Sequence, residues 1–171
     1  MKILTKEKFE DMFNIMDNSF PNTEMRTYEG QLALLDNPIY KIYYEELNNE
    51  VVAFIATFQL NNYSYIDHFA VSDKVRGTGI GSKFLKEYIK STNKQIILEV
   101  ERPINNIAIR RINFYERLGF NLYSYDYKQP PLRMNNPWID LYIMSNKPLE
   151  EINYKEVKQL LYKYVYQVEE Q

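Results

Sequence analysis

One stretch of sequence decides the fold: Val71-Ser72-Asp73-Lys74-Val75-Arg76-Gly77-Thr78-Gly79-Ile80-Gly81-Ser82-Lys83-Phe84-Leu85, which holds three of the five glycines of the chain. An apolar run precedes it and apolar residues at helical spacing follow it, which predicts a strand, a glycine-rich loop and a helix. Glycines let backbone N–H groups approach a ligand, and a helix N-terminus adds N–H donors and a positive dipole end. Arg76 adds a bidentate donor. The loop is therefore predicted to bind an anion, most often phosphate, unless its glycines only form a tight turn.

Two familiar nucleotide-binding loops fit the glycine spacing poorly. A Walker A loop needs the pattern G-x-x-x-x-G-K-S/T, which is absent. A dinucleotide fingerprint needs G-x-G-x-x-G/A, whereas Gly77, Gly79 and Gly81 give G-x-G-x-G. A nucleotide-binding protein that uses the same loop stays an alternative, although the strands upstream read as a hairpin.

Composition restricts the class of protein. The chain has 171 residues, which fits one domain, and its 45% hydrophobic residues are enough for a sizeable core. The formal net charge is −2 with scattered basic residues, so no nucleic-acid partner is expected. With no cysteine and one histidine, disulfides, a cysteine nucleophile and a histidine-rich metal site are excluded. No apolar stretch suits a signal peptide or a membrane span, so a cytoplasmic protein without a membrane partner is expected.

Hydrophobic periodicity predicts an α/β (α+β) chain with a mixed, mostly antiparallel sheet flanked by helices. Asn48-Asn49-Glu50 lies between two β runs and predicts a hairpin. One right-handed strand–helix–strand crossover is expected around the glycine loop. The expected elements are strand 2–4, a helix that Thr5 caps and Pro21 ends, helix 28–35, strands 40–47, 51–60 and 63–71, a helix after the glycines, strand 95–100, a helix ending at Gly119, strands 121–127 and 138–144, and a helix over about 153–168 begun by an Asn153–Glu156 capping box.

At this point the motifs resemble those of the GCN5-related N-acetyltransferase (GNAT) superfamily. Residues 76–81, RGTGIG, match its pattern Gln/Arg-x-x-Gly-x-Gly/Ala. Residues 98–100, LEV, and 113–120, NFYERLGF, look like its later motifs, and residues 66–71 look like the strand before its loop. The resemblance covers roughly residues 40–144 and implies the GNAT fold, with residues 1–171 as a single N-acetyltransferase domain.

The resemblance implies acetyl-CoA as the co-substrate, without a metal. The end of the strand, Phe69, Ala70 and Val71, would pair with the pantetheine arm and aim an N–H at the thioester carbonyl, where a fixed donor stabilises an oxyanion. The position of a pantetheine-binding asparagine in many members is Ala108 here, and whether Asn106 takes that role stays open. The loop residues that would hold the pyrophosphate are Arg76, Gly77, Thr78, Gly79, Ile80, Gly81 and Ser82.

The resemblance also implies direct transfer of acetyl from sulfur to an amine. The amine must first lose a proton, and a carboxylate serves as the base. Tyr115 matches the family's acid, with a core aromatic role as the alternative. Glu99 is the first choice for the base, and Glu101 and Asp67 remain alternatives. His68 is expected to be structural.

The leading interpretation is an acetyl-CoA-dependent N-acetyltransferase acting on a primary amine. The alternative is a non-catalytic acyl-CoA-binding or regulatory module, against which the presence of Tyr115 and Glu99 argues. The acceptor, a small molecule or a peptide, is left open. Tyr123, Tyr125 and Tyr127 either line an acceptor pocket or cover the sheet. The apolar stripe of the last helix packs on its own domain or forms a homodimer.

Overall fold

A computed structural model describes residues 1–169, and its main elements follow the predicted order. Short turns of 3-10 helix, η1 (Lys6–Lys8), η2 (Asn22–Glu24), η3 (Leu34–Asp36) and η4 (Asp73–Val75), join some of them. The last helix continues as a π-helix, η5 (Leu161–Tyr166). The main elements are β1 (Lys2–Ile3), α1 (Phe9–Ser19), α2 (Tyr28–Ala33), β2 (Tyr40–Leu47), β3 (Glu50–Leu60), β4 (Tyr63–Val71), α3 (Ile80–Ser91), β5 (Gln95–Glu101), α4 (Asn106–Glu116), β6 (Asn121–Gln129), β7 (Ile139–Ser145) and α5 (Glu151–Leu160).

The strands form one sheet in the order β1-β2-β3-β4-β5-β7-β6. Neighbouring strands are antiparallel except β4 and β5, which are parallel and are connected through α3. This arrangement confirms the predicted mixed, mostly antiparallel sheet. The predicted hairpin is β2–β3, and its turn residues Asn48 and Asn49 have φ angles of 51° and 68°, as a two-residue type I′ turn requires.

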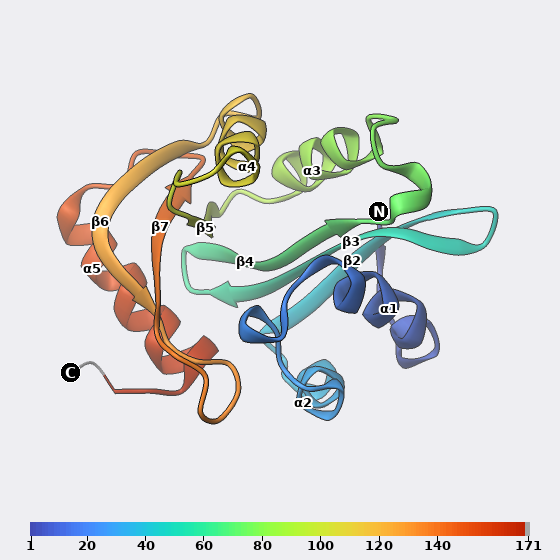
Figure 1. The fold of residues 1–171 in the computed structure, drawn as a ribbon, viewed down its shortest axis with the longest axis horizontal. Helices are drawn as coiled ribbons and strands as arrows, with labels where there is room; N and C mark the ends of the chain where they lie inside the picture. Colours follow the sequence, from blue (N-terminus) through green and yellow to red (C-terminus); the bar gives the residue numbers. More distant parts are fainter. Residues whose placement is uncertain (170–171) are drawn as a thin grey trace. The chain divides into compact units, whose positions relative to one another are not determined.

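The chain divides into two compact units, and β4 contributes residues to both. The first unit comprises Met1–Gln59 and Ile66–Asn93, and the second comprises Leu60–Tyr65 and Lys94–Gln171. Figure 1 labels the elements of each along the colour scale of the sequence.

In the first unit, helices cover both faces of the sheet formed by β2 and its neighbours. Tyr40 of β2 is hydrogen-bonded to Gln31 of α2, whereas the ring of Tyr43 contacts Tyr88 of α3 at 5.2 Å between centroids. Because side chains alternate between faces along a strand, α2 and α3 lie on opposite faces. The loop before α3 is thereby fixed at the end of β4.

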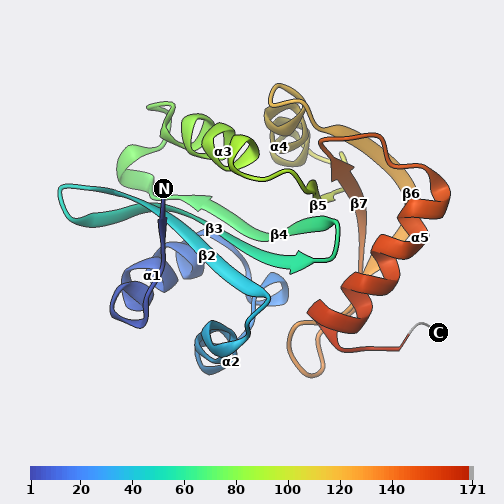
Figure 2. The same ribbon diagram turned by 180° about the vertical axis from the view of Figure 1, so that it is seen from behind.

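In the second unit, α5 and the π-helix run alongside β6 and β7 (Figures 1 and 2). Tyr125 of β6 stacks on Tyr154 of α5 with 4.3 Å between ring centroids, and the Tyr162 hydroxyl donates to the Lys128 carbonyl at 2.6 Å. Val157, Leu161 and Val165 of the last helix are buried within the chain, whereas Tyr164 is exposed. Within residues 1–169, every helix is too short or too polar to cross a membrane.

Two predicted helix caps are wrong. Thr5 precedes η1 and its side chain makes no capping hydrogen bond, and α1 begins only at Phe9. Asn153 and Glu156 lie inside α5, which begins at Glu151. The Glu156 carboxylate instead accepts a hydrogen bond from the Tyr63 hydroxyl at 3.0 Å.

Candidate active site

The backbone of the glycine loop is left-handed at two of its glycines. Gly77 and Gly79 have φ angles of 81° and 86°, which residues with a Cβ rarely adopt. A Cβ built on either would meet no atom within 4 Å. These two glycines are therefore needed for the course of the chain, and they leave open space above the loop.

Gly81 has a different role. A Cβ at this position would lie 2.9 Å from Cγ2 of Val71 and 3.5 Å from Cζ of Phe69. The absence of a side chain lets the first turn of α3 approach the end of β4. This packing brings together Phe69, Val71 and Gly81, three of the residues that the sequence assigns to the cofactor.

The N-terminus of α3 suits an anion. Gly79 is its N-cap and offers no side-chain acceptor, and the first turn holds no acidic residue. The first N–H groups of a helix have no partner within it and carry the positive end of its dipole. Arg76 pairs with Asp73 at 2.6 Å, but both side chains are more than 60% exposed, so the pair is weak and the guanidinium is accessible.

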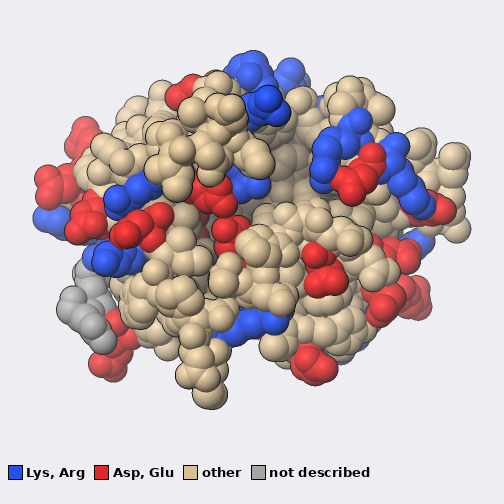
Figure 3. Space-filling model, viewed as in Figure 1, with Lys and Arg blue, Asp and Glu red and all other residues tan. Residues whose placement is uncertain are grey.

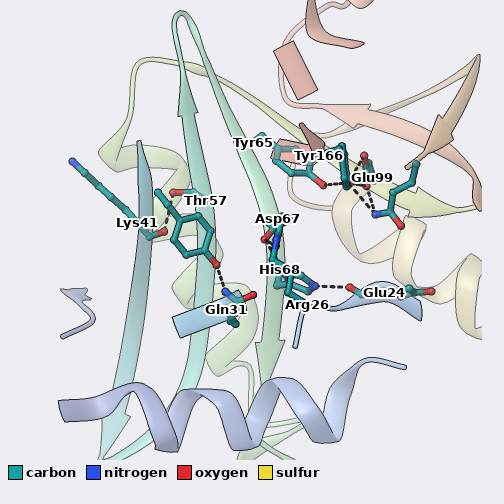
Figure 4. A network of polar contacts seen from close by, with 12 residues as sticks. Glu24, Arg26, Gln31, Lys41, Thr57, Tyr65, Asp67, His68, Glu99 and Tyr166 are labelled. Atoms are coloured by element: carbon teal, nitrogen blue, oxygen red, sulfur yellow. Dashed lines mark hydrogen bonds and ion pairs between the residues drawn. The ribbon is translucent and has the colours of Figure 1, made fainter. Parts of the chain in front are cut away.

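The Glu99 carboxylate, on β5, lies in a cluster of side-chain donors within the second unit. The Tyr127 hydroxyl donates to Oε1, and Gln129 Nε2 donates to Oε2 at 2.7 Å. The Tyr166 hydroxyl lies 2.9 Å from Oε1 and 2.8 Å from Oε2. Tyr65 lies next to Tyr166, with 3.0 Å between the hydroxyl oxygens, as Figure 4 shows. Glu99 is therefore held by neutral donors from three other elements, β4, β6 and the π-helix.

Burial governs the acidity of Glu99. Burial raises the pKa of the Glu99 carboxyl, while the hydrogen bonds from Tyr127 and Tyr166, and those from Tyr65 and Gln129, oppose that rise. The net shift is upward. A carboxylate whose pKa is raised binds a proton more readily, which is the property that a general base near neutral pH requires.

Tyr115 lies in α4 and is buried. Its ring packs against Phe114 and Phe120, with centroids 5.3 and 5.7 Å away. Burial raises the pKa of Tyr115 to about 12, and Arg111 partly opposes that rise. The phenol is therefore fully protonated through the neutral range and available as a hydrogen-bond donor.

Asp67, an alternative base, lies in a separate cluster within the first unit (Figure 4). Its carboxylate accepts from Arg26 at 2.7 Å and lies 3.1 Å from Nδ1 of His68. Burial raises the pKa of Asp67, but Arg26, followed by His68, outweighs burial and holds it well below its usual range. Nε2 of His68 lies 2.8 Å from the Glu24 carbonyl oxygen. The arrangement suits a structural ion pair rather than a proton acceptor.

The remaining candidates are Glu101 for the base and Asn106 for pantetheine binding. The side chain of Glu101 is 35% exposed and lies 3.9 Å from Arg111. Asn105 caps α4 by accepting from the Ala108 N–H at 2.9 Å, and Asn106 is the exposed first residue of that helix.

The three alternate tyrosines of β6 have two kinds of hydrogen-bond partner. Tyr123 and Tyr125 bind the backbone of Leu149 through their hydroxyls, at 3.1 and 2.9 Å, and so cover the sheet. Tyr127 reaches Glu99.

Sequence reasoning missed Gln129 and Tyr166. Tyr166 follows Glu99 by 67 positions and Gln129 follows it by 30. The local signal was weak: Gln129 reads as part of a loop before two prolines, and Tyr166 as one more apolar residue of the last helix.

Comparison with known proteins identifies the family. Residues 9–120 match the model of the acetyltransferase (GNAT) family. The chain therefore belongs to this family of acetyltransferases, whose members use an acyl-CoA donor. None of the curated proteins matches the chain in sequence.

Solved structures agree with the fold. A protein from Bacteroides thetaiotaomicron assigned to the GNAT family superposes with a TM-score of 0.92 at 29% identity, covering 98% of both chains. The ribosomal-protein-S18-alanine N-acetyltransferase from Escherichia coli gives 0.62 at 21% identity, covering 84% of this chain and 90% of that one. An aminoglycoside 6'-N-acetyltransferase in complex with coenzyme A gives 0.61 at 16% identity, covering 88% and 100%.

Proposed function

We propose that the protein is an acetyl-CoA-dependent N-acetyltransferase that moves the acetyl group to a primary amine by direct attack in a ternary complex. The observation that carries this proposal is the Glu99 carboxylate, which is held by Tyr127, Gln129 and Tyr166 and whose pKa is raised by burial. No cysteine is present to carry the acetyl group covalently, so direct transfer is the simpler route.

The donor would bind through the first unit. The backbone N–H groups of the loop, the N-terminus of α3 and the accessible guanidinium of Arg76 offer donors to the pyrophosphate. The extended end of β4, from Phe69 to Val71, offers backbone groups to the pantetheine amides. The cofactor-binding residues proposed are Phe69, Ala70, Val71, Arg76, Gly77, Thr78, Gly79, Ile80, Gly81 and Ser82.

The proposed steps follow from the pKa values of Glu99 and Tyr115, both raised by burial. Glu99, directly or through a water, takes a proton from the acceptor ammonium, and the neutral nitrogen attacks the thioester carbonyl carbon. A new C–N bond forms, a backbone N–H stabilises the oxyanion, and the C–S bond then breaks. Tyr115 donates its proton to the departing thiolate sulfur, and the second proton that the nitrogen loses as the amide forms restores the Tyr115 hydroxyl through solvent. The products are an N-acetyl amide and the thiol of CoA.

The acceptor is proposed to be a small-molecule or peptide amine. Figure 3 shows Lys and Arg interspersed with Asp and Glu on the face that it draws, without the single-sign stripe that a nucleic-acid surface has. Formation of a homodimer stays a prediction.

Two measurements test the proposal on the whole chain. Calorimetric titration with acetyl-CoA should show binding, whereas ATP and NAD should not bind. Thiol release should then appear with at least one member of a panel of polyamines, aminoglycosides, amino acids and peptides. Acetyl-CoA binding without turnover on any amine would favour the non-catalytic module. Binding of ATP or NAD in place of acetyl-CoA would contradict the donor assignment.

A further inference from the structure

We propose that Tyr166 and Gln129 are positioning residues that hold the Glu99 carboxylate in one orientation and stabilise its ionised form, so that the C-terminal π-helix is part of the catalytic apparatus. The inference rests on the proposed function, in which Glu99 is the base. It assigns a role to a part of the chain that lies beyond the matched residues 9–120.

The hydrogen bonds of the cluster run in one direction. A phenol has one proton, and Tyr166 lies within bonding distance of both Glu99 oxygens, so it donates to the carboxylate. Its oxygen is then left to accept. Gln129 Nε2 lies 2.7 Å from Oε2 of Glu99 and 3.0 Å from the Tyr166 oxygen, which uses both amide hydrogens. The Tyr65 oxygen lies 3.0 Å from that of Tyr166, and its hydrogen bond to Glu99 helps to lower the pKa of that carboxyl. The phenol protons and one amide hydrogen of Gln129 therefore point toward Glu99, and the other amide hydrogen points to the Tyr166 oxygen.

The groups that face Glu99 are neutral at physiological pH. The titratable ones are the phenols of Tyr65 on β4, Tyr127 on β6 and Tyr166 on the π-helix. On β5 itself, Glu101 shares the face of Glu99 but is turned to Arg111. Among the described residues, Glu99 forms no ion pair with a lysine, arginine or histidine. A cation there would hold the carboxylate too strongly ionised to accept a proton, whereas neutral donors orient it and leave its pKa raised.

The π-helix aims Tyr166 at the cluster. It begins at Leu161 and is followed by Gln167, whose φ is 56°. π-Helical turns are rare and are often found at functional sites. Here two tyrosines of one such segment reach β5 and β6: Tyr166 donates to the Glu99 carboxylate, while the Tyr162 hydroxyl donates to the Lys128 carbonyl. The two phenols form a matched pair for experiment.

The test compares Tyr166→Phe with Tyr162→Phe in the full chain. Glutamate labelled with ¹³C at the carboxyl is titrated by NMR, and the Glu99 signal is assigned by its loss in Glu99→Gln. Removing a donor from the ionised form should raise the midpoint of Glu99 by about one pH unit in Tyr166→Phe. Tyr162→Phe should leave the midpoint unchanged. Gln129→Met should shift it in the same direction as Tyr166→Phe, which keeps the test informative if one variant does not fold.

The same variants are assayed for turnover. In Tyr166→Phe the acidic limb of kcat/KM should move upward with the NMR midpoint, and the rate at high pH should approach that of the wild type. An unmoved Glu99 midpoint in Tyr166→Phe and Gln129→Met, or an equal shift in Tyr162→Phe, overturns the inference. A midpoint that moves without the acidic limb also overturns it, because Glu99 would not be the base. Absence of turnover in the wild type, with the midpoint shift present, instead overturns the proposed function.

Discussion

The guanidinium of Arg26 donates to the carboxylate of Asp67 across 2.7 Å, and the two side chains are only 10% and 1% exposed. A buried ion pair of this kind is strongly destabilised when one partner is removed, because the other charge is left without compensation. The pair links the segment after η2 to β4 within the first unit, and His68 contacts the same carboxylate. We therefore expect removal of the pair to lower the free energy of unfolding rather than the catalytic rate.

Asp67→Asn is expected to lower the free energy of unfolding at pH 7 by about 3 to 5 kcal/mol. Because the pKa of Asp67 is lowered in the folded state, this contribution is present above the unfolded pKa and is lost as the pH falls through the folded one. The difference between variant and wild type should shrink in acid. Urea unfolding at pH 7 and at pH 3 to 4 measures both.

The control is Glu50→Gln, which breaks the exposed pair of Glu50 with Lys74. Solvent screens exposed pairs and they contribute little to stability, so this variant should unfold almost as the wild type does. If Asp67→Asn cost no more than Glu50→Gln, the buried pair would not stabilise the first unit as described.

Gly79 allows the anion site to be tested by charge alone. Its φ of 86° is tolerated best by glycine, asparagine and aspartate, and a Cβ there meets no atom within 4 Å. Gly79→Asp and Gly79→Asn therefore add side chains of equal size at the N-cap of α3. We expect the aspartate variant to bind acetyl-CoA at least about tenfold more weakly than the asparagine variant, because its charge opposes the pyrophosphate.

Measuring the stability of both variants distinguishes weaker acetyl-CoA binding from misfolding. A negative N-cap interacts favourably with the helix dipole, so Gly79→Asp should be at least as stable as Gly79→Asn. Calorimetric dissociation constants for acetyl-CoA, measured beside thermal unfolding, give the comparison. Equal affinities in the two folded variants would show that no anion binds at this turn.

Tyr115→Phe tests the proposed acid. The phenol, with its pKa raised to about 12, is protonated at neutral pH and would be lost without a large change in packing. We expect kcat to fall by about 100-fold while the dissociation constant of acetyl-CoA stays the same. Tyr125→Phe, which removes a hydroxyl bonded to the Leu149 carbonyl, is the control and should keep its kcat. A normal kcat in Tyr115→Phe would leave Tyr115 as a core aromatic.

The sequence was informative where the structure depends on local spacing. The glycine loop, the Asn48-Asn49 turn and the helix ending at Gly119 all follow from residues that adopt positive φ, and each has it in the structure. The strand order β5-β7-β6 and the role of Gly81 depend on packing between distant segments. The G-x-G-x-G spacing alone does not predict that Gly81 lies against Val71.

The two wrong caps and the missed Tyr166 have the same physical origin. A capping pattern such as Asn153–Glu156 is short enough to occur inside a helix, where Tyr63 takes the Glu156 carboxylate instead. Tyr166 looks like any amphipathic helix residue until the fold brings its hydroxyl to Glu99. Hydrophobic periodicity indicates only that the last helix has an apolar stripe, and a single polar atom carries no periodic signal.

The stability change caused by Glu99→Gln should depend on pH in the opposite direction to that caused by Asp67→Asn, and activity should also fall. Burial raises the pKa of Glu99, so the folded state binds this proton more tightly than the unfolded state does. The stability that Glu99 contributes is therefore fully present below its unfolded pKa and is lost as the pH rises through the folded pKa. A neutral glutamine does not undergo this loss. Relative to the wild type, Glu99→Gln should gain stability between pH 4 and pH 8 while its turnover falls about 100-fold or more.

Urea unfolding of both proteins across this pH range measures the trend, with Glu101→Gln as the matched control. Glu101 lies on the same face of β5, but its side chain is 35% exposed and its partner is Arg111, so the desolvation that acts on Glu99 is largely absent there. The control should therefore show no comparable gain with pH. A difference between Glu99→Gln and the wild type that stays constant from pH 4 to pH 8 would mean that Glu99 does not titrate with a raised pKa. The case for Glu99 as the base would then lose its physical ground.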